Sequence, residues 1–339
     1  MSEIIRIGRP EELAALPAGG DVAPLDATLA ARHRPDLHLA LLDAGRLAAR
    51  LSLFWHDVPA RLPMRPDARL GAIGHYAARG DAEGIELLDA ACVALAKAGC
   101  GVAVAPMDGN TWRSYRLVTE RGTERPFLME PDNPDGWPRH FTGAGFEVIA
   151  TYHSSLAAVP GPADPRLAAA RVRLEAAGIK VRELDPARFA EELDGIFALS
   201  AASFARNFLY TPISREEFGA QYLPFAERIE PRLVLIAEHE GRAVGFLFAI
   251  PDWLETARAG RTTTAIVKTV AVDPARRHAG LGAWLVGLAH ERAAALGYRR
   301  VIHALMHDAN TSTNISRRYA RVLRRYALYG RRLRPGKRP

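Results

Sequence analysis

The chain has 339 residues, of which 48% are hydrophobic and 24% are charged, and its formal net charge is +7. These fractions are typical of a folded protein and exclude an intrinsically disordered chain. No run approaches the roughly 18 uncharged apolar residues that a membrane span needs, and the length predicts about two domains. Two cysteines cannot form a disulfide framework, and the N-terminus lacks a signal-peptide pattern. We therefore expect a cytoplasmic protein without a membrane partner.

The first half predicts a hairpin followed by a strand, a helix and further strands. Hydrophobic alternation, helical spacing and glycine stops place these elements. In chain order they are strands at Leu39–Leu42, Arg46–Trp55 and Arg69–Tyr76, a helix at Ala82–Ala98, a strand at Gly101–Ala105, a loop with the start of a helix at Pro106–Arg116, and a strand at Gly145–Tyr152.

A linker is predicted near the middle of the chain. Residues 157–171 read AAVPGPADPRLAAAR, and three prolines with one glycine in so short a span are typical of a connection between domains. We place a first domain at residues 1–160, the linker at 161–175 and a second domain at 176–339.

The second half repeats the order of the first. Its predicted elements are strands at Leu233–Glu238, Ala243–Ile250 and Thr262–Val272, a helix at Leu281–Leu296, a strand at Val301–Met306, a helix at Thr311–Leu323 and a strand at Tyr326–Leu333. A shared order in two halves indicates an internal duplication.

One stretch combines the features of an anion-binding loop. It runs VAVDPARRHAGLGAWL from Val270 to Leu285, and Asp-Pro breaks the strand before the helix begins. Gly280 and Gly282 let the backbone approach a ligand closely and turn its N–H groups toward it. The helix N-terminus adds the positive end of its dipole, and the two preceding arginines add donors suited to phosphate.

This stretch resembles the acetyl-CoA loop of the GNAT superfamily of N-acyltransferases. That loop has Arg or Gln, two further residues, Gly, any residue, and then Gly or Ala, which Arg277, Gly280 and Gly282 match. The resemblance implies an α/β (α+β) fold of two tandem GNAT-like domains, each a mixed, largely antiparallel twisted sheet flanked by helices. It also implies acetyl-CoA as the cosubstrate and no metal.

The resemblance further implies which residues bind the cofactor. In the family, backbone groups at the end of the strand hold the pantetheine arm and the thioester carbonyl, so that N–H donors stabilise the oxyanion. These positions are Val270, Ala271 and Val272 here. The pyrophosphate is expected on Arg277, His278, Ala279, Gly280, Leu281, Gly282 and Ala283. Asn310 opens a downstream segment that partly matches the family's Asn and Tyr pattern.

Candidates for proton transfer lie around that downstream segment. Tyr319 is the candidate general acid for the leaving thiolate, with Ser316 as an alternative and packing on a helix as the competing interpretation. His307 and Glu238 end two strands and are candidate bases, although a water chain could replace a single base.

The equivalent loop of the first half lacks the pattern. Gly84 aligns with Gly280, while Asp81 stands at the position of Arg277 and Glu86 at that of Gly282. Two acids repel a pyrophosphate, so we expect a degenerate first domain. Its later polar and aromatic residues either form an acceptor pocket facing the second domain or cap a long loop; they are Trp112, Tyr115, Arg116, Glu130 and Asn133.

Positive charge is concentrated at the end of the chain. Residues 309–339 contain no acid and ten basic residues, which leaves the first 308 residues at −3. A basic segment is typical of an anion-binding surface or of a solvated, composition-driven face.

Three classes of function follow. The first is an N-acetyltransferase that transfers acetyl from acetyl-CoA to a primary amine of a small molecule or a peptide. The alternatives are a non-catalytic acyl-CoA sensor or scaffold and an aminoacyl-transferase of tandem-GNAT type. Nucleic acid is not expected as a partner, and a homodimer is left open.

Overall fold

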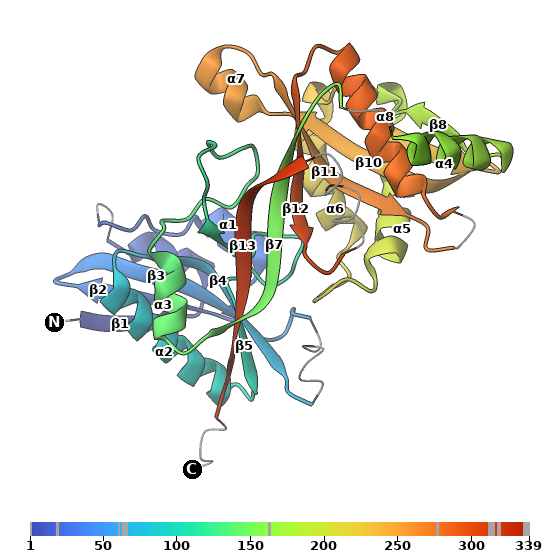
Figure 1. Ribbon diagram of the computed structural model, residues 1–339. Helices are drawn as coiled ribbons and strands as arrows, with labels where there is room; N and C mark the ends of the chain where they lie inside the picture. Colours follow the sequence, from blue (N-terminus) through green and yellow to red (C-terminus); the bar gives the residue numbers. More distant parts are fainter. Residues whose placement is uncertain are drawn as a thin grey trace.

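The computed structural model describes residues 2–17, 20–59, 62, 67–161, 164–275, 278–310, 316 and 320–334. Figure 1 shows two lobes, each built from a sheet with helices against it, and two long strands that run between them.

The first half contains β1 (Ser2–Ile7), a 3-10 helix (Pro10–Ala15), α1 (Ala27–His33), β2 (Leu37–Asp43), β3 (Arg46–Phe54), β4 (Leu70–Ala78), α2 (Asp81–Lys97), β5 (Val102–Ala105), β6 (Leu117–Glu120), α3 (Trp137–Gly143) and β7 (Glu147–Ala158). The second half contains α4 (Pro165–Ala176), β8 (Lys180–Glu183), α5 (Phe189–Phe204), α6 (Arg215–Tyr222), β9 (Val234–His239), β10 (Arg242–Pro251), α7 (Trp253–Ala259), β11 (Thr264–Val272), α8 (Leu281–Ala295), β12 (Arg300–His307) and β13 (Ala320–Arg332). Three short 3-10 helices occupy Pro186–Arg188, Leu223–Arg228 and Pro231–Leu233.

All the described strands belong to one sheet. Its order is β1-β2-β3-β4-β5-β13-β7-β12-β11-β10-β9-β8, and β6 pairs with β13 beside this path. Neighbouring strands are antiparallel except for β4 with β5 and β11 with β12, which are joined through α2 and α8. The predicted fold class, a mixed but largely antiparallel sheet flanked by helices, is therefore confirmed.

The two halves exchange their last strands. β7 ends the first half, yet it pairs with β12 of the second half. β13 ends the chain, yet its residues Tyr329–Arg332 pair with β5 of the first half. The two exchanged strands also pair with each other, from Ala320↔Ala157 to Gly330↔Glu147, and run side by side between the lobes (Figure 1).

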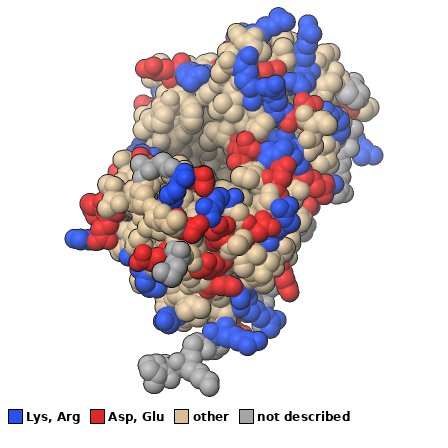
Figure 2. Space-filling model, turned by 90° about the vertical axis from the view of Figure 1, so that its left-hand side faces the viewer, with Lys and Arg blue, Asp and Glu red and all other residues tan. Residues whose placement is uncertain are grey.

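This exchange explains the basic end of the chain. Four arginines of β13 form ion pairs with acids of the first half, which carries the excess of negative charge: Arg321 with Glu124, Arg324 with Glu130, Arg325 with Glu120 and Arg331 with Asp89. Acidic and basic side chains are interspersed on the face that Figure 2 shows. The charge asymmetry along the sequence thus becomes complementarity in the fold, which does not favour a nucleic-acid surface.

Helices cover both faces of the second-half sheet. Leu281, Leu285 and Ala289 of α8 pack with Leu174 of α4 over one face. Ile196 of α5 and Phe218 of α6 pack over the other face, together with residues of the first half such as Phe127. Loops of the first half therefore reach the same face of the second-half sheet as α5 and α6.

Three local predictions differ from the structure. Helix α4 occupies most of the predicted linker, because Asp164 caps it and Pro165 fits its first turn. Residues 106–116 form no helix; Met107 and Tyr115 instead make an isolated bridge that closes a loop. Residues 320–323 belong to β13 rather than to the predicted helix. None of the described helices is long and apolar enough to cross a membrane.

Candidate functional site

β11 and β12 form a fork. They pair in parallel only from Thr264↔Arg300 to Val267↔His303, although β11 continues to Val272 and β12 to His307. On their outer edges, β11 remains paired with β10 and β12 with β7 to the ends of both strands. Residues 268–272 therefore present one backbone edge that no strand of the described residues pairs with.

Backbone N–H groups point into this fork. The amide of Val272 donates to the hydroxyl of Ser203 in α5 (3.3 Å) and not to β10. Because amides alternate in direction along a strand, the amide of Val270 points the same way and that of Ala271 faces β10. Of the three predicted strand residues, Val270 thus directs its N–H into the fork, while the N–H of Val272, which points the same way, is bonded to Ser203.

The fork leads directly to an uncapped helix. Gly280 is the N-cap residue of α8, with a φ of 89° that favours glycine, and no side chain caps the helix. The first amides of a helix have no partner within it, so Leu281, Gly282 and Ala283 present free donors at the positive end of the dipole. A Cβ added at Gly282 meets nothing closer than 3.6 Å, which leaves room beside its backbone.

Sequence analysis missed one cation at this loop. Arg173 lies in the segment predicted as a linker, and its guanidinium donates to the carbonyl oxygen of Ala279. A Cβ on Gly280 would lie 3.4 Å from Nη2 of Arg173. Helical spacing within Pro165–Ala176 is the signal that could have placed this arginine on a helix.

Two side chains of the loop, those of His278 and Leu281, are buried. His278 is 2% exposed, its Nδ1 lies 3.6 Å from the Asp273 carboxylate, and its ring packs edge-on to His239. Leu281 is fully buried in the core beneath α8. These two predicted residues can therefore meet a cofactor through their backbone, not through their side chains. Arg277 lies outside the described residues.

His307 lies at the end of β12, on the open side of the fork. Its ring packs edge-on to Tyr152 and against Phe208. The amide of Ala309 donates to its Nδ1 (3.1 Å), so the neutral ring holds its proton on Nε2. Burial lowers the pKa of His307, which keeps the ring neutral. Asn310 is exposed in the turn that follows, where its amide donates to the carbonyl oxygen of His307.

Ser316 is buried within a chain of polar side chains. Its Oγ contacts Nδ1 of His303 and donates to Sδ of Met306, and Nε2 of His303 lies 2.8 Å from Nε2 of His290. Burial lowers the pKa of His290 to about 4 and that of His303 to about 3, so both rings are neutral. Tyr319, the other candidate acid, lies outside the described residues.

Glu238 lies two strands away from the fork. Its carboxylate accepts from Nε and Nη2 of Arg182, at 2.9 and 2.7 Å, and the same guanidinium is bonded to Glu192. This arrangement on β9 favours a structural ion pair over a base that faces the thioester.

The first half has no equivalent loop. Only Arg79 and Gly80 separate β4 from α2, and Gly80 is the N-cap of that helix. Gly80 therefore corresponds to Gly280, and the sequence alignment of Gly84, Asp81 and Glu86 with the second loop is wrong. A Cβ on Gly84 would lie 2.4 Å from the Tyr76 hydroxyl and 2.5 Å from Nδ1 of His140, so side chains fill this place.

Loops of the first half cross to the second. Trp112 donates from Nε1 to the carbonyl oxygen of Thr211, and its ring packs edge-on to Phe204, Tyr210 and Phe218. Arg116 donates from Nη1 to the carbonyl oxygen of Leu305 in β12 (3.0 Å). The side chain of Asn133 accepts from the amide of Val118 and donates to its carbonyl oxygen, so Asn133 caps the loop and does not line an acceptor pocket.

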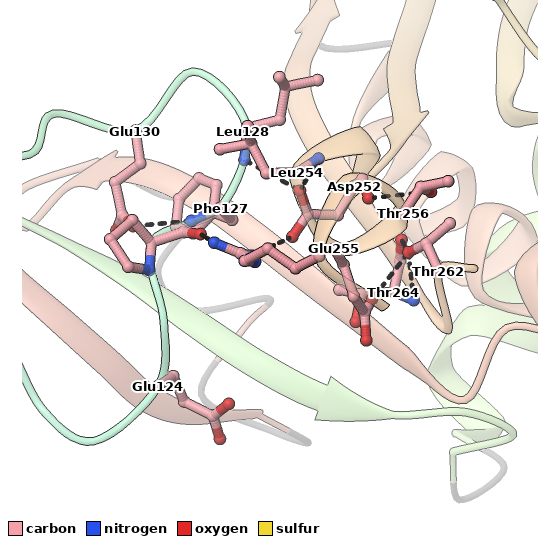
Figure 3. A network of polar contacts seen from close by, with 12 residues as sticks. Glu124, Phe127, Leu128, Glu130, Asp252, Leu254, Glu255, Thr256, Thr262 and Thr264 are labelled. Carbon is pink, nitrogen blue, oxygen red and sulfur yellow. Dashed lines mark hydrogen bonds and ion pairs between the residues drawn. The ribbon is translucent and has the colours of Figure 1, made fainter. Parts of the chain in front are cut away.

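A cavity of about 340 Å³ lies at the opposite end of β11 and β12. Figure 3 shows the first-half loop with Glu124 and Phe127 beside Asp252 and Glu255 of the second half. Arg300 spans the cavity wall and pairs with both Glu124 and Glu255 at 3.2 Å. These charges are paired with one another, so the ion pairs around the cavity join the two halves and do not indicate a ligand.

A buried histidine cluster lies in the first half. His33, His75 and Asp108 place potential metal-binding atoms within 4.8 Å of one another. However, Nδ1 of His33 and Nε2 of His75 lie 2.8 Å apart, whereas two nitrogens on one tetrahedral zinc ion lie about 3.3 Å apart. His75 also bonds through Ser52 to His38, so the arrangement is a hydrogen-bonded chain.

The fold and the fork together define the class of GNAT-like proteins. Residues 199–320, in the second half of the chain, match the Acetyltransferase (GNAT) family. This match supports an N-acyltransferase. Among curated proteins, none is significantly similar to this chain.

Solved structures resemble the whole chain. A GCN5-related glucosamine N-acetyltransferase region of a fungal multi-domain β-N-acetylglucosaminidase is 14% identical, with a TM-score of 0.56; the match covers 98% of this chain but 38% of that one. A GCN5-related N-acetyltransferase from Sphaerobacter thermophilus is 14% identical over 98% and 96% of the two chains, with a TM-score of 0.51. A tandem GNAT protein from the clavulanic acid biosynthesis pathway is 14% identical over 99% and 100%, with a TM-score of 0.50. At these identities the likeness shows the fold alone, which is that of a tandem GNAT protein.

Proposed function

We propose that the second half transfers an acyl group from an acyl-CoA, most simply acetyl-CoA, to a primary amine. The observation that supports this is the continuity of two backbone donor sets. The unpaired edge of β11 at Val270 and Val272 leads into the free amides at Gly282 and Ala283. A cofactor that has an amide-rich arm ending in a thioester, with a pyrophosphate at its other end, matches this order of donors.

The loop supplies several kinds of donor to the pyrophosphate. Backbone amides at the start of α8 provide directed N–H groups, and the helix dipole adds a partial positive charge. Arg173 adds a full charge beside Gly280, where its guanidinium is already held by the carbonyl oxygen of Ala279. Arg277 has the same role by its place in the sequence pattern.

The reaction needs a nucleophilic amine and a stabilised oxyanion. The neutral amine attacks the thioester carbonyl carbon, a C–N bond forms, and the carbonyl oxygen gains negative charge. The amide of Val270 is placed to donate to that oxygen. The C–S bond then breaks, its electron pair leaves on sulfur, the ammonium loses a proton, and the thiolate takes one up. The products are an amide and the free thiol.

His307 is better suited to donating a hydrogen bond than to accepting a proton. Its Nδ1 is occupied by the amide of Ala309, so the neutral ring offers an N–H at Nε2. That group can hydrogen-bond to the leaving thiolate or to a water that protonates it. Tyr319 and Ser316 remain the alternative acids, and a water chain remains the alternative base.

Titration of the full chain with CoA tests the donor site. We expect Gly282→Asp to abolish binding, because it places a negative charge beside the free amides of α8. Gly195→Asp is the matched control, since Gly195 is exposed in α5 and a Cβ there meets nothing within 4 Å. Unchanged CoA affinity in Gly282→Asp would contradict the site. Binding of acetyl-CoA without turnover on any amine would favour the sensor over the enzyme.

A further inference from the structure

Three residues with left-handed backbone meet at the base of the fork. Arg116, Met129 and Leu305 have φ values of 71°, 62° and 59°, although none is glycine. This conformation costs a non-glycine residue about 1–2 kcal/mol, and such residues concentrate at functional sites. Arg116 and Met129 come from loops of the first half, whereas Leu305 lies in β12.

Two of these residues, Leu305 and Met129, direct backbone carbonyl oxygens at two cations, Arg116 and Lys268. Nη1 of Arg116 donates to the carbonyl oxygen of Leu305 (3.0 Å), and Nζ of Lys268 lies 3.4 Å from the carbonyl oxygen of Met129. Lys268 occupies a bulge in β11, because the register with β10 shifts between Phe248 and Ala249. It is also the first residue of β11 beyond the last parallel pair, Val267↔His303. The strained backbone thus holds Arg116 and Lys268 where the fork opens.

Arg116 is a buried cation without an acidic partner among the described residues. It is 8% exposed, and its guanidinium carbon lies 3.8 Å and 4.3 Å from the ring centroids of Tyr115 and Tyr152. Its buried Nε has no hydrogen-bond partner. The aromatic faces stabilise the positive charge but do not use its in-plane N–H donors, of which Nη1 bonds to Leu305 and Nε has no partner.

Two other arginines that join the halves form ion pairs. Arg324, which is 1% exposed, forms an ion pair with Glu130, and Arg300 pairs with Glu124 and Glu255. Glu130 is the acid that acts electrostatically on Lys268, but its oxygens are already bonded to Arg324 and Tyr326. Burying a charge without a counter-charge is costly, which suggests that Arg116, which is buried, is completed by a ligand together with the half-buried Lys268.

We propose that Arg116 and Lys268 bind an anionic group of the amine acceptor, a carboxylate or a phosphate, so that the acceptor is an amino-acid-like or amino-phosphate compound. This inference rests on the proposed acyltransfer and names the acceptor class for it. A guanidinium and an ammonium together match the oxygens of either anion. With a rise of about 3.3 Å per residue, Val270 and Val272 lie about 7 and 13 Å along β11 from Lys268. An acceptor of amino-acid size can therefore reach the thioester carbonyl with its amine.

Matched amines with and without the anion test the proposal on the full-length protein. The pairs are glycine with methylamine, β-alanine with ethylamine, γ-aminobutyrate with propylamine, ornithine with putrescine, and lysine with cadaverine. Phosphoethanolamine beside β-alanine distinguishes a phosphate from a carboxylate. Release of free thiol from acetyl-CoA reports turnover, and the shift in unfolding temperature in the presence of CoA reports acceptor binding.

We expect at least one compound that carries the anionic group to be used with a kcat/KM about tenfold or more above that of the matched amine without it. Arg116→Met and Lys268→Met should each lower that kcat/KM by about tenfold to a hundredfold, which is the usual loss for a hydrogen bond to a charged group. The KM for acetyl-CoA and the rate with the neutral amine should change little. Arg171→Met is the control, because Arg171 pairs only with Glu175 on the surface of α4.

Each outcome decides between the two proposals. An anionic compound that shifts the unfolding temperature without turnover, with the shift lost in Lys268→Met, keeps the anion site and contradicts the transferase. Equal use of both members of every pair keeps the transferase and overturns the anion site. Neither a shift nor turnover with any anionic compound also overturns the anion site. If Arg116→Met does not fold, Arg116→Lys and Lys268→Met carry the same comparison.

Discussion

Arg324 of β13 and Glu130 of the first half form an ion pair in which both side chains are fully buried. Arg324 also donates to the backbone carbonyl oxygens of Arg121 and Glu124, and Tyr326 donates its hydroxyl hydrogen to Glu130. β13, the last strand of the chain, thus holds the first-half loop that contains Met129. The exchanged strand therefore positions the loop beside the fork.

Breaking this pair should destabilise the protein strongly. Arg324→Met leaves a buried carboxylate without its counter-charge, which costs about 3–5 kcal/mol. Urea unfolding of the variant measures the loss. The double variant Arg324→Met with Glu130→Met should lose clearly less than the sum of the two single losses, because the partners interact directly. Additive losses would show that the pair contributes no coupling.

Replacing Glu238 should leave turnover nearly unchanged. The carboxylate pairs with Arg182 on β9, two strands from the fork, so Glu238→Gln removes an ion pair and not a base. We expect initial rates within about twofold of the wild type and a stability loss below about 1 kcal/mol, as for exposed pairs. A rate loss of tenfold or more would restore Glu238 as the base.

His307→Phe should lower kcat more than it weakens donor binding. The substitution removes the N–H at Nε2, and because a hydrogen bond to a charged group is worth about 1.5–3 kcal/mol, we expect kcat to fall by about tenfold to a hundredfold. Because burial lowers the pKa of His307, its contribution should be constant from pH 7 to 8. A titration of kcat that followed an imidazole near pH 7 would contradict this assignment.

Lys268 should make stability depend on alkaline pH. Burial, with a contribution from Arg116, lowers the pKa of Lys268 to about 8 from 10.5, while Glu130 opposes the shift. Between these values the unfolded chain binds more protons, so wild-type stability gains from raising the pH from 8 to 10.5. Lys268→Met should be the more stable protein at pH 7 and lose this advantage by about pH 10.5. Parallel stability curves for the two proteins would contradict the lowered pKa of Lys268.

Arg173 should contribute to donor affinity although it lies outside the sequence pattern. Its guanidinium lies at Gly280, so Arg173→Met removes one charged donor from the pyrophosphate site. We expect CoA to bind about threefold to thirtyfold more weakly, within the range for one charge-assisted hydrogen bond. Arg171→Met on the same helix is the control. Equal CoA affinities for the two variants would exclude Arg173 from the site.

Local patterns predicted the elements around the fork. Alternation and β-branched residues placed β9 to β12 to within a few residues, and the Gly280 loop with helical spacing placed α8. Strand partners were beyond such patterns. The exchange of β7 and β13 depends on contacts between residues more than 200 positions apart, such as Arg332 with Val102. No local periodicity encodes those contacts.

The acceptor side was predictable only in outline. Tyr115 and Arg116 stood out as a polar and aromatic group, yet the loop was expected to start a helix. Its left-handed backbone at Arg116 and its bond to Leu305 arise from packing against the other half. Lys268 was hidden within a β-branched strand, since neither the bulge it occupies nor its contact with Met129 of the first half follows from a local pattern.

The direct test of the account is calorimetric titration of the full chain with acetyl-CoA, before and after Gly282→Asp. We predict one molecule bound per chain for the wild type and no measurable binding for the variant, with both proteins equally folded by circular dichroism. Absence of binding to the wild type, or equal affinity for both proteins, would contradict a donor site formed by β11 and α8.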